Sequence, residues 1–187
     1  VGLVASTEGL KSRKVVEYGI EALKAVWHRG AIDADGKTGD GAGIHIEIPN
    51  DFFAEKIEIT GHEHDNSDLC VGMIFLPRND FGGQEQCRSI VESELTKKNF
   101  NIYGWRQVPV DPSVLGEKAE QTRPEIAQVL FTHNDKSIHG KDLERALYET
   151  RRKIEKEALR NQLNNFYICS VSYTHLTLPT IRWGWRS

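Results

Sequence analysis

The most informative part of this chain is a glycine-rich stretch: His28-Arg29-Gly30-Ala31-Ile32-Asp33-Ala34-Asp35-Gly36-Lys37-Thr38-Gly39-Asp40-Gly41-Ala42-Gly43. Five glycines and three aspartates stand there among few large side chains, so the stretch gains little from burial. Glycine adopts backbone angles that other residues resist, and it lets a ligand or another strand come close. A helical pattern leads into the stretch, and a strand pattern, Ile44-His45-Ile46-Glu47-Ile48, leaves it. We therefore predict an ordered helix-to-strand connection, a place where functional sites are often built.

Helical periodicity appears in three parts of the chain. Ser12 is a suitable N-cap for a first helix, and apolar residues recur after it at helical spacing. A shorter helix is expected at 86–97 and a long one at 141–162, with a polar, glycine-containing turn at 77–86. The residues expected to face inward are Val16, Ile20, Leu23 and Trp27 in the first helix, and Leu143, Leu147, Ile154 and Ala158 in the last.

Segments rich in valine, isoleucine, phenylalanine and tyrosine alternate with these helices. Strands are expected at residues 43–49, 70–76, 101–110, 125–132 and 166–171. This order is compatible with sheets packed between layers of helices. Periodicity alone therefore predicts an α+β fold in one domain.

Composition narrows the class of protein. The 187 residues carry a net charge of −3 without a lysine-arginine block, which argues against nucleic acid as a partner. No apolar run approaches the roughly 20 residues needed to cross a bilayer, and no signal-peptide pattern is present. Cys70, Cys87 and Cys169 form neither a disulfide framework nor a metal-binding pair. A reducing, cytoplasmic setting is expected.

Phosphate binding is one rival interpretation of the glycine stretch. Residues 30–38 nearly spell a P-loop, since they end Gly36-Lys37-Thr38. The spacing is one residue too long, because glycine would be required at Ala31. A P-loop also runs from strand to helix, the reverse of the order expected here. If ATP with magnesium left the melting temperature of the protein unchanged, this phosphate-binding interpretation would be excluded.

Metal binding is also disfavoured. The Asp33-x-Asp35 start hints at a calcium loop, but Ile44 occupies the position of the bidentate glutamate and Thr38 that of the turn glycine. A second patch, among glycine, serine and asparagine typical of loops, is expected to be a solvated surface loop rather than a metal site. Its candidate ligands are His62, Glu63, His64, Asp65 and Asp68.

Several motifs follow one another over residues 1 to about 170: His28–Ala31, Thr38–Ile44, Ile48–Phe53, Val71–Pro77, Gly104–Asp111 with Leu115, Gly116 and Ala119, Pro124–Val129, Arg151–Ile154 and Phe166–Ser170. In this order they are similar to the N-terminal glutaminase domain of the glutamate synthase large subunit, a class II glutamine amidotransferase of the N-terminal-nucleophile hydrolase type. Several motifs in one order are far more specific than a single short match.

The resemblance implies a fold and a reaction. The fold would be a four-layer αββα sandwich, incomplete here, with a partial amidotransferase domain at residues 1–170. The parent enzyme would convert glutamine and 2-oxoglutarate into two glutamates, and this domain would release ammonia from L-glutamine through a γ-glutamyl thioester. FMN, an iron–sulfur cluster and a reductant (NADPH, NADH or ferredoxin) would act elsewhere in the enzyme, with no cofactor in this fragment. The expected partners are the rest of the large subunit and a small reductase subunit.

Both ends depart from the family pattern. The family's mature chain begins Cys-Gly-Val-Gly-Phe, whereas this one begins Val1-Gly2-Leu3 and matches from the third position onward. In such enzymes the thiol of the first residue attacks the amide and its own α-amino group is the base. With the nucleophilic cysteine absent upstream of Val1, the fragment is expected to be inactive. Residues 171–187 are similar to translated sequencing-adapter read-through and are excluded from the fold prediction as a non-native tail.

Arg29 is the one catalytic-site residue that the resemblance carries over. There it would lie beside the N-terminal cysteine and order the nucleophile's pocket, whereas an isolated arginine after a helix is usually a solvated cation near the helix terminus. Gly30, Gly39, Asp40, Gly41 and Gly43 are expected to build the backbone of the loop, with Asp40 bonding loop amides. Substrate-binding residues are not identified, and no metal ligand is assigned.

The remaining candidates are interpreted as structural. His28 is not needed as a base, because the α-amino group already serves. Trp105 and Arg106 are expected to be structural strand residues, and Cys169 an inert core thiol. The alternative from a different class is a non-catalytic α/β domain used for binding or scaffolding. The identity of the residue encoded just before Val1 distinguishes the glutaminase interpretation from this alternative.

Overall fold

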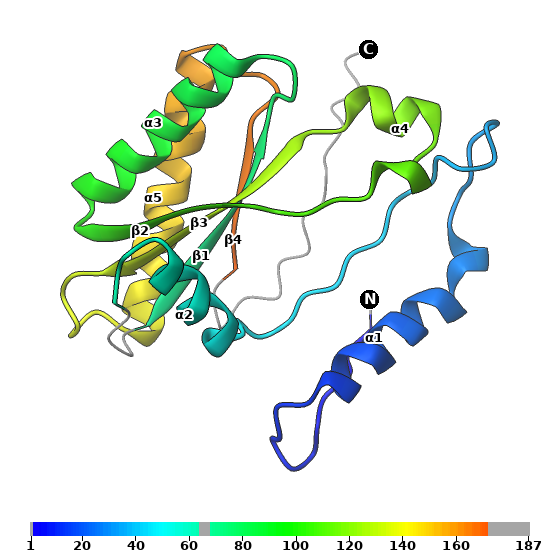
Figure 1. The fold of residues 1–187 in the computed structure, drawn as a ribbon, viewed down its shortest axis with the longest axis horizontal. Coiled ribbons are helices and arrows are strands. Elements are labelled where there is room, and N and C mark those ends of the chain that lie inside the picture. Colours follow the sequence, from blue (N-terminus) through cyan, green and yellow to red (C-terminus); the bar gives the residue numbers. More distant parts are fainter. Residues whose placement is uncertain (1, 64–67, 172–187) are drawn as a thin grey trace. The chain divides into compact units, whose positions relative to one another are not determined.

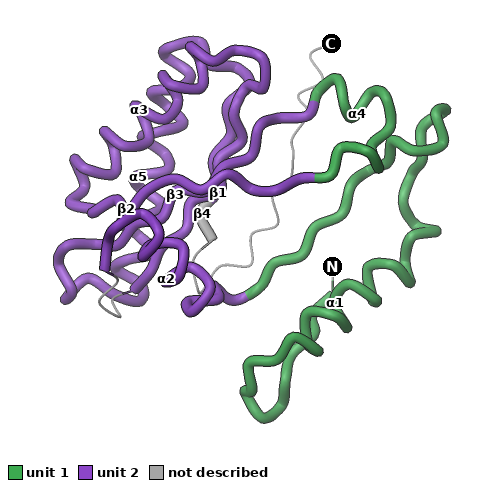
Figure 2. The backbone as a smooth tube through the Cα atoms, in the orientation of Figure 1, with its two compact units in different colours: residues 1–46, 111–122 green, residues 47–110, 123–187 purple. Residues whose placement is uncertain are grey.

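The computed structural model describes residues 2–63 and 68–171. It contains two compact units (Figure 2). One consists of residues 1–46 and 111–122, and the other of residues 47–110 and 123–187. Each unit is described by itself below, as unit 1 and unit 2. The single domain expected over residues 1–170 stays a prediction.

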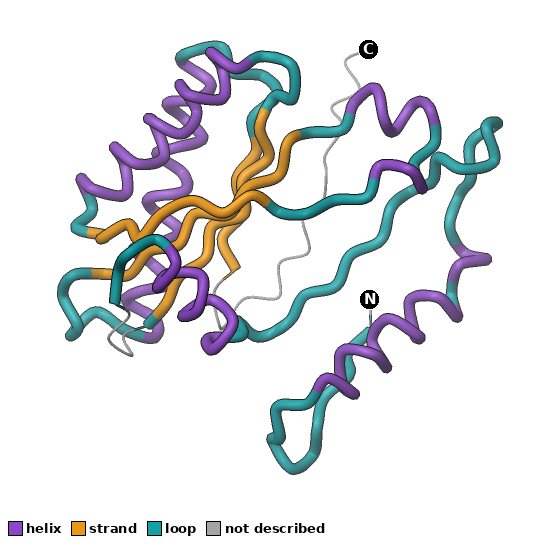
Figure 3. The backbone as a smooth tube through the Cα atoms, in the orientation of Figure 1, coloured by secondary structure: helices purple, strands orange, loops and turns teal. Residues whose placement is uncertain are grey.

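Unit 2 is built on one antiparallel sheet in the order β2-β3-β1-β4 (Figure 3). Its strands are β1 (Leu69–Leu76), β2 (Phe100–Gln107), β3 (Glu125–His133) and β4 (Tyr167–Val171). Four of the five expected strands are therefore confirmed. The central pair, β1 and β3, aligns Met73 with Gln128, and a register shift between Ile102 and Gly104 interrupts the pairing of β2 with β3.

The strand predicted at residues 101–110 differs from the observed strand at its C-terminal end. β2 stops at Gln107 instead of continuing to Val110. The amide of Val108 still donates to the carbonyl of Ile126 at 2.9 Å, but the next position of β2 that faces β3 lies opposite Pro124, which has no N–H to continue the ladder. The proline thus explains why the apolar pattern outlasts the strand.

Two helices cover one face of this sheet, as Figure 1 shows. They are α3 (Phe81–Lys97) and α5 (Gly140–Arg160). The four residues predicted to face inward on α5 are all buried, and Thr150 joins them. The core between helices and sheet includes Cys70, Ile74, Leu76, Cys87, Val91, Leu95, Phe100, Ala127, Val129, Phe131, Leu143, Leu147, Ile154 and Ile168.

Helix α3 starts five residues earlier than the helix predicted from 86, so the turn predicted over 77–86 is wrong from Phe81 onward. Asp80 is the reason, because its carboxylate accepts a hydrogen bond from the amide of Gly83 at 2.8 Å and caps the helix. Gly82 and Gly83 favoured the prediction of a turn, because glycine is common in turns. A strong N-cap placed before them outweighed their low helix propensity.

The opposite face of the sheet is covered at one end by α2 (Asn50–Ile59). This helix was not predicted, although Phe53 and Ile57 are four residues apart and both are buried. With Ile48 they cover the sheet residues Leu69, Val71, Tyr103 and Leu130. Farther along the same face, Met73 and Phe75 are only half-buried. The second face of the sheet is therefore apolar but incompletely covered in unit 2.

The strand predicted over 43–49 is wrong. Residues 41–49 have no helix or strand, and among the described residues no strand pairs with this segment. Ile44 and Ile46 are exposed, and only Ile48 is buried. Alternation of apolar and polar residues favours a strand, but a ladder needs a neighbouring strand, and these residues lack one here.

Unit 1 contains α1 (Arg13–Ala25), the short 3-10 helices η1 (Trp27–Arg29) and η2 (Pro112–Val114), and α4 (Glu117–Thr122). The cap predicted at Ser12 is confirmed, since its hydroxyl accepts from the amide of Lys14 at 3.2 Å. The prediction of a buried stripe is wrong, because no residue of α1 is buried and Trp27, in η1, is 70% exposed. Within unit 1, the side chain of Ile44 lies near α1, since a Cβ built on Gly19 would be 3.0 Å from it.

The elements together confirm the α+β class. No helix in the described part of the chain combines the length and apolar character needed to span a membrane. Strand β4 ends at Val171, and the remainder of the predicted tail, 172–187, lies outside the described residues.

Candidate functional site

Arg29 ends the turn of 3-10 helix that follows α1. Its amide donates to the carbonyl of Val26 at 3.0 Å, and its side chain is exposed. His28 is exposed in the same turn. Gly30 then takes an extended conformation, with φ −82° and ψ 147°, so the chain leaves the helix directly after Arg29. The candidate arginine is thus presented at the junction between a helix and the glycine stretch.

The glycine stretch folds back on itself as a hairpin-like turn. Ile32 forms an isolated antiparallel bridge with Gly39, and the amide of Asp33 donates to the carbonyl of Thr38 at 2.7 Å. The hydrogen bond expected of Asp40 is present, since its carboxylate accepts from the amide of Ala31 at 2.9 Å. The two ends of residues 31–40 are therefore joined just after Arg29.

Asp35 closes the tip of this turn. Its carboxylate accepts hydrogen bonds from the amides of Lys37 and Thr38, at 2.9 and 2.7 Å, and from the Thr38 hydroxyl at 2.5 Å. These bonds, from Thr38 first of all, favour the charged form and lower the pKa of Asp35 to about 2. Sequence reasoning missed this role and considered Asp35 only as a calcium ligand. The signal was the Asp35-Gly36 dipeptide, which is typical of turns.

The predicted loop glycines differ in how strongly the backbone requires them. Gly41 has φ +77°, a left-handed conformation that side chains disfavour. A Cβ built on Gly39 would lie 3.1 Å from the carbonyl oxygen of Ala31, a tight approach across the bridge. Gly30 and Gly43 meet neither condition, since Gly30 has only ordinary contacts and Gly43 has open space. The part predicted for these two glycines in building the loop is not explained by local geometry.

The cysteines in unit 2 are not set up as nucleophiles. Burial raises the pKa of Cys70 to about 12 and that of Cys87 to about 11. Burial also raises the pKa of Cys169, which is half-buried opposite Met73 in the sheet. A thiol must ionise to attack, so these three are poor nucleophiles near neutral pH. The position expected of the nucleophile precedes Val1, which lies outside the described residues.

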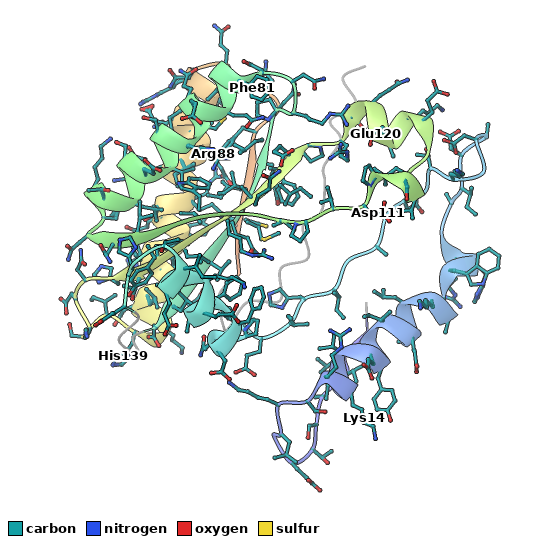
Figure 4. The ribbon with its side chains drawn as sticks, viewed as in Figure 1. Lys14, Phe81, Arg88, Asp111, Glu120 and His139 are labelled. Atoms are coloured by element: carbon teal, nitrogen blue, oxygen red, sulfur yellow. The ribbon has the colours of Figure 1, made fainter. Side chains whose placement is uncertain are left out.

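Trp105 and Arg106 contact neighbouring elements of unit 2. The indole N–H of Trp105 donates to Glu92 at 2.7 Å, and the guanidinium of Arg88, labelled on α3 in Figure 4, lies 4.7 Å from its ring centroid. Arg106 extends from the other face, where it donates to Gln128 at 2.8 Å and lies 5.2 Å from the ring centroid of Phe52. Both side chains therefore have contacts that a structural role explains.

The patch considered for metal binding is only partly described. His64 and Asp65 lie outside the described residues, while Nδ1 of His62 lies 3.1 Å from the hydroxyl oxygen of Thr60. Among residues 2–63 and 68–171, no group of three or more His, Cys, Asp or Glu side chains could hold a metal ion.

Comparison with known sequences places this geometry in a family. The family described as "Glutamine amidotransferases class-II" matches residues 1–178. The chain therefore belongs to the class II glutamine amidotransferases. The turn after Arg29 and the antiparallel sheet are thus parts of an amidotransferase domain.

Its relatives point more narrowly to glutamate synthases. The chain is 52% identical over 172 residues to the glutamate synthase [NADPH] large chain of Azospirillum brasilense, and 37% identical over 177 residues to the ferredoxin-dependent glutamate synthase of Pyropia yezoensis. A chloroplastic ferredoxin-dependent enzyme of Arabidopsis thaliana is 36% identical over 174 residues. Each match covers 92% of this chain and 11% of the relative, so the chain spans about a ninth of those proteins.

Proposed function

We propose that this chain is part of the glutaminase domain of a glutamate synthase large subunit, and that its substrate is L-glutamine. The observation that carries the proposal is the 52% identity to a glutamate synthase large chain over 92% of this chain. The match runs over 172 residues, so it reflects most of the chain rather than one motif.

The reaction proposed is nucleophilic catalysis by an N-terminal cysteine encoded ahead of Val1. Its thiolate attacks the γ-carbonyl carbon of glutamine after the α-amino group takes the thiol proton. The carbon–nitrogen bond breaks, ammonia leaves with a proton, and a γ-glutamyl thioester remains. Water then hydrolyses the thioester to glutamate and restores the thiol. Arg29 orders the pocket of the nucleophile.

The fold proposed for the complete domain is the four-layer αββα sandwich. The half-covered second face of the sheet in unit 2 supports it, because Met73, Phe75 and Ile126 are apolar and only half-buried there. A second sheet packed on that face would bury them, as sheets in sandwiches do. The other face already has its helix layer in α3 and α5. Residues 1–170 would belong to this domain, and 171–187 would not.

The parent enzyme proposed is an oxidoreductase that passes the ammonia to 2-oxoglutarate. FMN, an iron–sulfur cluster and the reductant would be held by parts of the enzyme outside this chain, with a small reductase subunit as partner, in the cytoplasm. The NADPH-type relative shares more identity with this chain than the ferredoxin-type ones do, 52% against 37%. This difference favours a nicotinamide nucleotide as the electron donor.

The test begins with the source gene. We expect codons for Cys-Gly directly before Val1 and a long open reading frame in place of the tail. The enzyme encoded by that frame should release ammonia from glutamine and form a γ-glutamyl adduct visible by mass spectrometry. A Cys-to-Ser variant of its first residue is the matched control and should lose both. If another residue precedes Val1 and the tail is encoded, a non-catalytic binding or scaffold domain becomes the better account.

A further inference from the structure

The connection between β2 and β3 belongs to unit 1 instead of closing as a hairpin on the sheet. Residues 111–122 contain η2 and α4, and Figure 4 labels Asp111 at the start of this segment and Glu120 on α4. Asp111 gives the segment its local order, because its carboxylate accepts from the amide and the hydroxyl of Ser113, at 3.0 and 2.6 Å. The segment is thus a built element rather than a slack loop.

Gly116 packs this segment against the tip of the turn that follows Arg29. A Cβ built on Gly116 would lie 2.6 Å from the backbone nitrogen of Thr38, and closer still to the Thr38 hydroxyl and the Asp35 carboxylate. Real Cβ atoms do not come so close to a backbone nitrogen. Gly116 is buried, and its φ lies outside the left-handed region, so the constraint is one of space alone.

Lys118 adds a charged contact to the same turn. Its ammonium lies 2.6 Å from the carboxylate of Asp33. The hydrogen bond lowers the pKa of Asp33 and raises that of Lys118. The pair is exposed, so it contributes little by itself and acts mainly to direct how the segment sits.

Pairings between the two sides of the turn connect its tip to Ala31, close to Arg29. Thr38 accepts from Asp33, Ile32 bridges Gly39, and Ala31 donates to Asp40. Ala31 is two residues from Arg29. A displacement at the tip would therefore reach the backbone at the end of η1.

We propose that residues 111–122 are a latch that positions Arg29 for the amidotransferase reaction, with Gly116 and Lys118 as positioning residues. The catalytic role of the latch rests on the proposed function. The contact between residues 111–122 and the turn does not depend on it. In the chain, the same segment joins β2 to β3.

The first test measures the latch in this chain by hydrogen exchange. In Gly116→Ala, the amides of Asp33, Gly36 and Thr38 should exchange about tenfold faster or more, because their turn opens more often. Gly82→Ala is the matched control, since an added Cβ there meets nothing closer than 3.6 Å. It should leave the turn unchanged. Unchanged exchange in Gly116→Ala overturns the proposal.

Lys118 keeps the test decisive if Gly116→Ala fails to fold. Lys118→Met should raise exchange at Asp33 and Thr38 a fewfold, while Lys118→Arg should restore it. Arg160→Met is the control for loss of a surface ion pair, because Arg160 pairs with Glu157 on α5 in unit 2. If Arg160→Met affects the turn as much as Lys118→Met does, the latch is wrong.

The second test uses the glutaminase activity of the enzyme encoded by the source gene. Gly116→Ala and Lys118→Met should lower kcat by tenfold and by a fewfold, and Lys118→Arg should recover it, with the melting temperature of Lys118→Met unchanged. Faster exchange with an unchanged kcat refutes the positioning role. A wild-type enzyme without glutaminase activity refutes the proposed function instead, and the exchange test still decides whether the contact exists.

Discussion

Helices α5 and α1 carry similar apolar stripes, yet they end in different surroundings. On α5 every residue predicted to face inward is buried, and Ile154 is only 1% exposed. On α1 none is buried, and Trp27, the last residue of the expected stripe, is 70% exposed. Periodicity says which face of a helix is apolar. It does not say whether the same chain supplies a surface to cover that face.

The comparison predicts its largest effect in the core of unit 2. Ile154→Ala should lower the free energy of unfolding by about 2–5 kcal/mol, because it leaves a cavity among well-packed side chains. Leu159→Ala on the same helix is the control, since Leu159 is 72% exposed. Urea unfolding followed by circular dichroism checks both. A loss below 1 kcal/mol for Ile154→Ala would break the contrast between the two helices.

Unit 1 should be most sensitive in its glycine stretch rather than in its helix. Gly41→Ala should cost about 1–2 kcal/mol locally, because alanine resists the left-handed conformation of that residue. Gly43→Ala, with open space and no positive φ, should cost far less. Hydrogen exchange across residues 31–40 measures both variants. Equal effects would mean that backbone conformation is not what makes this stretch rich in glycine.

The cap of α1 tests how much that helix depends on local interactions. Ser12→Ala should destabilise α1 by about 1 kcal/mol, because the amide of Lys14 loses its acceptor. Since α1 has no buried residue, local terms should matter more there than in α5. Amide exchange within residues 13–25 is the measurement, with Ser89→Ala, an exposed serine inside α3, as control. Unaffected exchange in α1 would show that something other than the cap holds it.

The smallest expected effect depends on pH. The folded pKa of Asp35, about 2, is below its ordinary value of 3.8, so its charged form stabilises the turn above pH 4. That stabilisation should be lost as pH falls from about 4 through about 2. A carbon-13 NMR titration of the carboxyl group should give a midpoint near 2. A midpoint near 3.8 would contradict the hydrogen bonds described at the turn, and Asp35→Asn should remove the pH dependence.

The sheet and its two covering helices were predictable because their patterns are satisfied by near neighbours within unit 2. Helix α2 was missed, since Phe53 and Ile57 alone give a short apolar pattern directly after a segment that was predicted as a strand. Residues 43–49 were predicted as a strand because alternation is a property of the segment itself. Pairing is a property of the segment beside it.

The candidate site could be predicted only as far as local chemistry reaches. The bond from Ala31 to Asp40 follows from the habit of aspartate in turns, and it is present. The contact of Gly116 with Thr38 joins residues far apart in the sequence, and no local pattern announces it. The same holds for the pair of Lys118 with Asp33, which are separated by 85 positions.

That separation has a consequence for synthesis. A ribosome adds about 5–20 residues per second, so Lys118 is made roughly 4–17 s after Asp33. During this interval the nascent chain carries the turn after Arg29 without the segment that holds it, while α3 and β2 are already being made. Neither unit is a continuous piece of chain, so each is synthesised in two parts, and the parts of the two units alternate along the sequence.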